Sequence, residues 1–146
     1  MSHLLLPLAV VSLAFAPLPF PKPVTAKADL EKMQGEWRCV SCILDGKRRD
    51  LSSHPITATV KGDRMGFGSP DDNWRLVLDV TPDVRRIDFH RVKPLGGTDL
   101  IRGVYRLDGD TLTICWRMRK DAKDRPTSLD PAQPDVWVYA YKRHKP

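Results

Sequence analysis

The sequence lacks the local motifs on which catalysis and nucleotide binding usually depend. Its 146 residues contain no G-x-S-x-G nucleophile elbow, no phosphate-binding Walker loop and no G-x-G-x-x-G fingerprint. The four histidines form no H-x-H or H-E-x-x-H grouping, and many of the acidic residues fall in turns, where they have a structural role. We therefore predict a non-enzymatic protein with no catalytic residues and no cofactor. An enzyme of unknown class is the remaining alternative.

Cysteine is scarce, with three residues in the chain. Cys39 and Cys42 form a C-x-x-C, but alternation along a strand would turn their sulfurs to opposite faces. Their Cα atoms would lie roughly 10 Å apart, beyond the limit of about 7 Å for a disulfide. A second C-x-x-C or a Cys/His pair, which zinc would need, is absent. We predict no metal or redox centre here, while a bridge from Cys115 to either cysteine stays open.

Long hydrophobic runs are absent except near the start. Leu4–Ala16 is an uncharged apolar run of 13 residues, short of the roughly 20 that cross a bilayer as a helix. Its length suits the hydrophobic region of a secretory signal, with Val24-Thr25-Ala26 as the exit and cleavage before Lys27. We expect residues 1–26 to be a signal peptide, residues 27–146 to form one domain, and the protein to be exported to the periplasm or medium, without a permanent membrane span.

Positive charge exceeds negative charge, but it is spread along the chain. There are 24 Lys and Arg against 18 Asp and Glu, a formal net charge of +6. The densest groups, Lys47–Arg49 and the stretch from Arg117 to Arg125, accompany neither a helix nor an aromatic platform. We expect solvated surface at both places and no nucleic-acid partner.

Strand patterns dominate the rest of the chain. Ala28–Gln34 is the one short helical segment, and Gly35 ends it. Hairpin turns are indicated at Gly62-Asp63 and Asp108-Gly109-Asp110. The expected strands are Glu36–Leu44, Ile56–Lys61, Arg64–Phe67, Trp74–Val80, Arg85–Val92, Leu100–Leu107, Thr111–Met118 and Val136–Lys142. About eight antiparallel strands without long helices between them predict an all-β barrel or sandwich.

Several of these segments together resemble a known family. The opening M-Q-G-E-W of Met33–Trp37, the V-S of Val40-Ser41 and the D-G-K of Asp45–Lys47 are similar to the start of a lipocalin-like uncharacterised family abundant in planctomycete bacteria. The most specific stretch is Gly103–Cys115, with the sequence G-V-Y-R-L-D-G-D-T-L-T-I-C. The remaining matches, in chain order, are Val60–Asp63, Leu78–Thr81, Ile87-Asp88, Arg125–Thr127 and Lys142-Arg143.

The resemblance covers roughly residues 29–143. It implies a small exported antiparallel lipocalin-like barrel with a short N-terminal helix and no established activity. In such barrels a G-x-W at the start of the first strand closes one end, and a basic side chain from near the end of the chain lies over the indole. Cys39 and Cys42 depart from the family, which has apolar or small residues there. The structural motif that the resemblance implies comprises Gly35, Trp37, Asp108, Gly109, Asp110 and Arg143, with Lys142 as the alternative basic residue.

Two functions remain open for such a barrel. It could bind a small apolar or amphipathic ligand in its interior, since eight strands can enclose one small molecule. Alternatively, its interior is filled, and its outer surface or loops bind a protein or polymer of the cell envelope. An interior crowded by Trp and Tyr would favour the second function, and an apolar cavity would favour the first.

Export gives the first testable prediction. N-terminal sequencing of the protein recovered from the exported fraction should begin near Lys27, because the apolar run and the small-residue exit precede it. Recovery of the soluble protein from the cytoplasm with Met1 intact would contradict the prediction.

Overall fold

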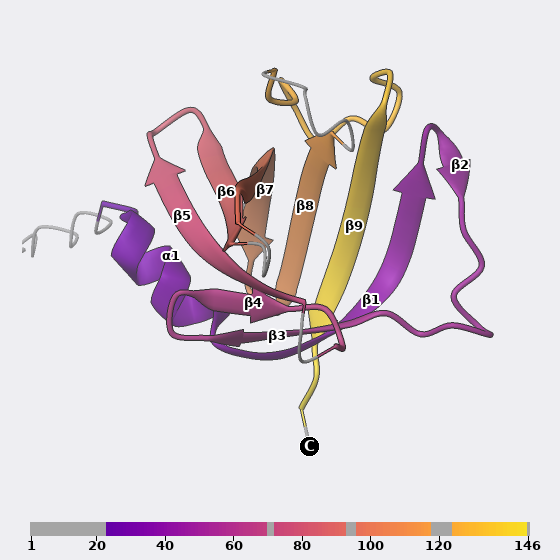
Figure 1. Cartoon of the computed structure of the whole chain (residues 1–146), viewed down its shortest axis with the longest axis horizontal. Coiled ribbons are helices and arrows are strands. Elements are labelled where there is room, and N and C mark those ends of the chain that lie inside the picture. The colour runs from indigo at the N-terminus through magenta and orange to yellow at the C-terminus, as the bar shows by residue number, and fades with distance from the viewer. Residues whose placement is uncertain (1–22, 70–71, 93–95, 118–123, 146) are drawn as a thin grey trace, which may run out of the picture.

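The computed structural model describes residues 23–69, 72–92, 96–117 and 124–145, so the segment expected to be the signal run lies outside the described residues. β1 pairs antiparallel with β2 and with β3, and from β3 onward each strand pairs antiparallel with the next. β1 also pairs with β9, which closes an eight-stranded barrel (Figure 1). This confirms the expected antiparallel all-β barrel. The elements are α1 (Ala26–Met33), β1 (Gly35–Leu44), β2 (Lys47–Arg48), β3 (Thr57–Lys61), β4 (Arg64–Gly66), β5 (Asn73–Val80), β6 (Arg85–Val92), β7 (Thr98–Asp108), β8 (Thr111–Arg117) and β9 (Val136–Arg143).

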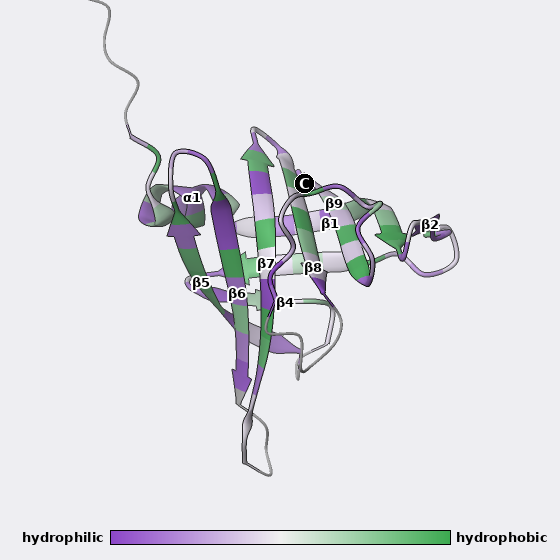
Figure 2. Ribbon diagram, turned by 90° about the horizontal axis from the view of Figure 1, so that it is seen from above, coloured by the Kyte–Doolittle hydropathy of each residue, from purple (hydrophilic) through white to green (hydrophobic). Residues whose placement is uncertain are grey.

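Alternating side chains give the barrel an apolar interior and a polar exterior. On β3, Ala58 and Val60 are buried while the residues on either side are exposed. On β5, Trp74 and Leu76 point inward and Arg75 points outward. Figure 2 shows this alternation as bands of hydrophobic and hydrophilic residues along the strands. The expected turns at Gly62-Asp63 and Gly109-Asp110 join β3 to β4 and β7 to β8.

The N-terminal helix begins two residues earlier than the sequence pattern indicates. Thr25 is its N-cap, because the Thr25 hydroxyl accepts a hydrogen bond from the backbone N–H of Ala28 at 3.1 Å. The two-residue strand β2 was not expected, and it forms a hairpin with the end of β1. Among the described residues, no helix has the length and apolar character that crossing a membrane requires.

A β-bulge in β1 overturns the expectation that Cys39 and Cys42 face opposite ways. Cys39 pairs with Tyr141 and Ser41 pairs with Ala140, so Val40 is an extra residue that has no partner on β9. One inserted residue reverses the alternation beyond it. Cys39 and Cys42 are therefore both buried in the barrel core, while Val40 is 48% exposed. All three cysteines are free thiols.

The loop before β9 is fastened to the outside of the barrel. The Arg125 guanidinium lies 2.7 Å from the Asp88 carboxylate and donates a hydrogen bond of 2.6 Å to the carbonyl oxygen of Gly103. Pro126 is fully buried, and Leu129 packs on a small outer cluster that includes Cys115. A Cβ atom at Gly103 would lie 2.7 Å from the carbonyl oxygen of Cys115, so this position of the barrel wall requires glycine.

Burial of the thiols yields a prediction about their reactivity. Desolvation raises the pKa of Cys39 to about 11 and that of Cys115 to about 11, and it also raises the pKa of Cys42. Because the thiolate is the reactive form, a disulfide reagent such as Ellman's reagent should label the native protein slowly at neutral pH and label all three thiols after denaturation. Rapid labelling of the native protein would contradict the buried positions.

Candidate functional site

One end of the barrel interior is filled, and Trp37 is at its centre. We call this the filled end; it is the end where β1 begins and β9 finishes. The Trp37 side chain is 1% exposed, and its indole N–H donates a hydrogen bond of 2.8 Å to the carbonyl oxygen of Met33. That carbonyl lies in the last turn of α1, where backbone carbonyls have no hydrogen-bond partner within the helix. The bond therefore fixes the helix to the first strand.

Arg143 completes the filled end from the last strand. Its guanidinium lies over the Trp37 ring, 4.3 Å from the centroid. It also donates hydrogen bonds to the carbonyl oxygen of Gln34 at 2.7 Å and to the carboxylate of Asp110 at 3.0 Å. Gly35 has a φ of +110°, and a Cβ atom at this position would lie 3.6 Å from the same guanidinium. Of the residues in the expected motif, the structure thus brings Gly35, Asp110 and Arg143 together with Trp37.

The other expected members serve the turn beside them. Asp108 pairs with Thr111 where β7 meets β8, and Gly109 takes the left-handed conformation of the turn, with a φ of +54°. Asp110 also pairs with Lys145 at 2.6 Å. Hydrogen bonds from Lys145 and Arg143 lower the pKa of the Asp110 carboxyl. Lys142, the alternative basic residue, is exposed. The motif is a structural closure of the barrel.

A buried carboxylate fastens the helix to the opposite wall. Asp29 of α1 is fully buried and accepts a hydrogen bond of 2.8 Å from the Tyr105 hydroxyl. The Arg85 guanidinium lies 3.4 Å from the same carboxylate oxygen. Burial and the neighbouring Asp29 carboxylate raise the pKa of Tyr105, so its hydroxyl remains a donor. This buried network holds α1 against β6 and β7.

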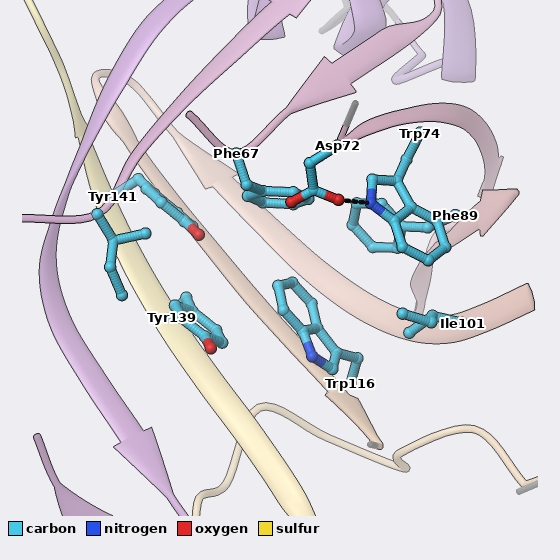
Figure 3. Close-up of a pocket in the computed structure, with 9 residues that line it drawn as sticks. Phe67, Asp72, Trp74, Phe89, Ile101, Trp116, Tyr139 and Tyr141 are labelled. Carbon is cyan, nitrogen blue, oxygen red and sulfur yellow. Dashed lines mark hydrogen bonds between the residues drawn. The ribbon is translucent and has the colours of Figure 1, made fainter. Parts of the chain in front are cut away.

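The opposite end of the interior, which we call the hollow end, contains a pocket. Its volume is about 210 Å³, and it is partly open to solvent. Six of the nine lining residues are aromatic (Figure 3). The lining residues are Ile56, Phe67, Asp72, Trp74, Phe89, Ile101, Trp116, Tyr139 and Tyr141.

Aromatic contacts hold the pocket walls in place. Phe89 and Trp116 meet edge to face with their centroids 5.3 Å apart, and Phe67 packs against both. On the other side, Trp116 stacks on Tyr139 at 4.7 Å. Such pairs contribute about 0.5–1.5 kcal/mol each beyond the area they bury. Burial raises the pKa of Tyr139 and of Tyr141, so both remain neutral phenols. The aromatic side chains of the lining are therefore uncharged and support one another.

Asp72 is the charged member of the lining. Its carboxylate accepts a hydrogen bond of 2.6 Å from the Trp74 indole N–H, drawn dashed in Figure 3. The Arg91 guanidinium lies 3.6 Å from the same oxygen and 4.5 Å from the centroid of the Trp74 ring. Arg91 is bound in turn by Asp99 at 3.2 Å. The pocket therefore has an ordered, charged corner beside an aromatic cavity.

Sequence reasoning identified none of these pocket residues. Charged residues at inward-facing positions near strand ends were the signal that could have indicated this site. In the alternating pattern of their strands, Arg91 lies on the same face as Phe89, and Asp99 lies on the same face as Ile101. In the part of the chain that the structure describes, no group of three or more His, Cys, Asp or Glu side chains is placed to hold a metal ion. The arrangement at the hollow end suits binding of an organic molecule.

A double-mutant cycle measures the closure at the filled end. Trp37→Phe and Arg143→Met each keep apolar bulk, and their coupling in the free energy of unfolding should be about 0.5–2 kcal/mol if the guanidinium stabilises the indole. Chemical denaturation of the four proteins gives this number. As a control, Arg143→Met combined with Trp74→Phe, at the other end of the barrel, should show additive effects. Additivity in the Trp37 cycle would leave Trp37 as a core aromatic only.

Comparisons with known proteins leave the geometry as the basis for any functional statement. No protein-family model matches the chain, and no curated protein and no solved structure is significantly similar to it.

Proposed function

We propose that this protein is an exported, non-enzymatic barrel that binds a small apolar or amphipathic ligand at its hollow end. The observation that carries the proposal is the pocket of about 210 Å³ among aromatic side chains. Protein interiors are close-packed, and voids much larger than a water molecule are few. A cavity of this size, partly open to solvent, is better suited to an exchanging ligand than to structural support.

The pocket volume limits the size of the ligand. A cavity of about 150 Å³ lined by apolar side chains can hold benzene, whereas pockets for drug-sized ligands are about 300–1,000 Å³. At about 210 Å³, the hollow end corresponds to a molecule of about one substituted ring. Phe67, Phe89 and Trp116 would contact it with ring faces and edges.

In the alternative function, the barrel is filled and binds a protein or envelope polymer through its exterior. The packing at one end of the interior supports this alternative. The filled end is packed by α1, Trp37 and Arg143. At the hollow end, however, Trp74, Trp116 and Tyr139 line a space instead of occupying it. This difference between the two ends favours the ligand-binding function.

Export and family membership belong to the same proposal. The apolar run Leu4–Ala16 and the exit at Ala26 support export. Cleavage before Lys27 would remove Thr25, the cap of α1, while leaving Asp29, Met33 and the contacts that fasten the helix. The lipocalin-like resemblance is supported by the positions of its motifs: the G-x-W starts β1, and the specific stretch Gly103–Cys115 forms the β7–β8 hairpin.

Filling the pocket tests the ligand-binding proposal. Ile101→Trp places a large side chain at a lining position, so it should abolish binding of tert-butylbenzene, measured by ligand-observed NMR, while the circular dichroism of the barrel is retained. Val77→Trp is the matched control, because Val77 is 41% exposed on the outside of β5 and its replacement should leave binding unchanged. Equal binding by both variants, or failure of the unmodified protein to bind this and charged probes of the same shape, would contradict the proposal. Native mass spectrometry of the protein from its own exported fraction would identify a retained molecule.

A further inference from the structure

We propose that the ligand of the hollow end is a small organic cation, an ammonium group attached to an apolar body. This inference rests on the proposed function and specifies the chemistry of the same site. Ring faces carry negative potential and attract ammonium groups, most effectively quaternary ones. Trp74, Phe89, Trp116 and Tyr139 supply such rings, and Asp72 supplies a carboxylate beside them.

The charge of the pocket has one sign. Among the described residues, Asp72 is the only Asp, Glu, Lys, Arg or His side chain that lines it. The other polar atoms of the lining belong to uncharged side chains. Trp116 Nε1 and Tyr141 Oη are buried and have no hydrogen-bond partner among the described residues, and the Tyr139 hydroxyl is hydrogen-bonded to Cys42. A ligand in this cavity therefore meets aromatic rings and one carboxylate.

Arg91 shows that this corner already accepts a cation. Its guanidinium lies over Trp74 at 4.5 Å and beside Asp72 at 3.6 Å, the two kinds of contact that an ammonium group would make. Arg91 is itself outside the pocket lining and is held back by Asp99 at 3.2 Å. Two carboxylates, those of Asp72 and Asp99, contact this one guanidinium.

Asp72 is also held in a fixed orientation. The Trp74 N–H donates to one carboxylate oxygen at 2.6 Å, and the Asp72 backbone carbonyl accepts from Phe67 at 3.4 Å, which ties the residue to both sides of the cavity mouth (Figure 3). A neutral ligand that covers this carboxylate would desolvate it without replacing its water contacts, which costs free energy. An anionic ligand would in addition be repelled. A cation restores the lost contacts and gains attraction from the rings.

Three probes of similar shape separate the alternatives. Phenyltrimethylammonium, tert-butylbenzene and benzenesulfonate each carry one ring and a tetrahedral head group, and they differ in charge. Binding to the full-length protein is measured by ligand-observed NMR titration. We expect the cation to bind at least about tenfold more tightly than the neutral probe, a difference of about 1.4 kcal/mol, and the anion not to bind. Equal affinity for the cation and the neutral probe would overturn the inference and leave the ligand-binding barrel intact. Absence of binding by all three probes would overturn both proposals.

Two variants assign the preference to the charged corner. Asp72→Asn keeps an oxygen acceptor for Trp74 and should lose most of the preference for the cation, with unchanged affinity for tert-butylbenzene. The control Asp79→Asn removes an exposed carboxylate that pairs with Arg86 on the outside of the barrel, and it should retain the preference. Arg91→Gln removes the competing guanidinium, so its preference for the cation should rise. If Asp72→Asn also loses the neutral probe, the Arg91→Gln result decides, and an unchanged or reduced preference there would overturn the inference.

Discussion

The ladder between β1 and β9 runs from the Trp37–Arg143 pair at one end to the Leu44–Trp137 pair at the other. Without it, the eight strands would form an open meander with two unpaired edges, which proteins generally avoid. With it, every inward-facing side chain lies in a common enclosed space. The bulge at Val40 belongs to this ladder, and it brings both Cys39 and Cys42 into the core. The β1–β9 ladder thus determines which residues lie inside the barrel.

The two ends of the interior use the same pair of residue types in different ways. At the filled end, Arg143 lies over Trp37, donates a hydrogen bond to the backbone carbonyl of Gln34 and forms an ion pair with Asp110. At the hollow end, Arg91 lies over Trp74 but is bound by two carboxylates, one of which also lines a cavity. The helix accounts for much of the difference, since α1 contributes Met33 and its terminal carbonyls to the filled end alone.

Much of the fold was predictable because its determinants are local. Turn residues such as Gly62-Asp63 and alternating burial within each strand can be read from short segments, and they defined the hairpins correctly. The bulge could not be predicted, because it is defined by the register against β9, far away in the sequence. The pocket was also beyond local reasoning. Trp37 and Trp74 have the same inward pattern in their strands, and only the assembled barrel makes one a packed residue and the other a cavity wall.

Closure through Arg143 also sets an order of events in folding. Arg143 and Gln34 are separated by 109 positions, so the entropy of bringing the two ends of the sheet together must be overcome before their contacts are gained. The hairpins, whose partners are adjacent in sequence, can form earlier. Until β9 reaches β1, the aromatic residues of the interior lie on one face of an open sheet with free edges. The contact with a large cost in loop-closure entropy is therefore also the one that removes the surface prone to association between chains.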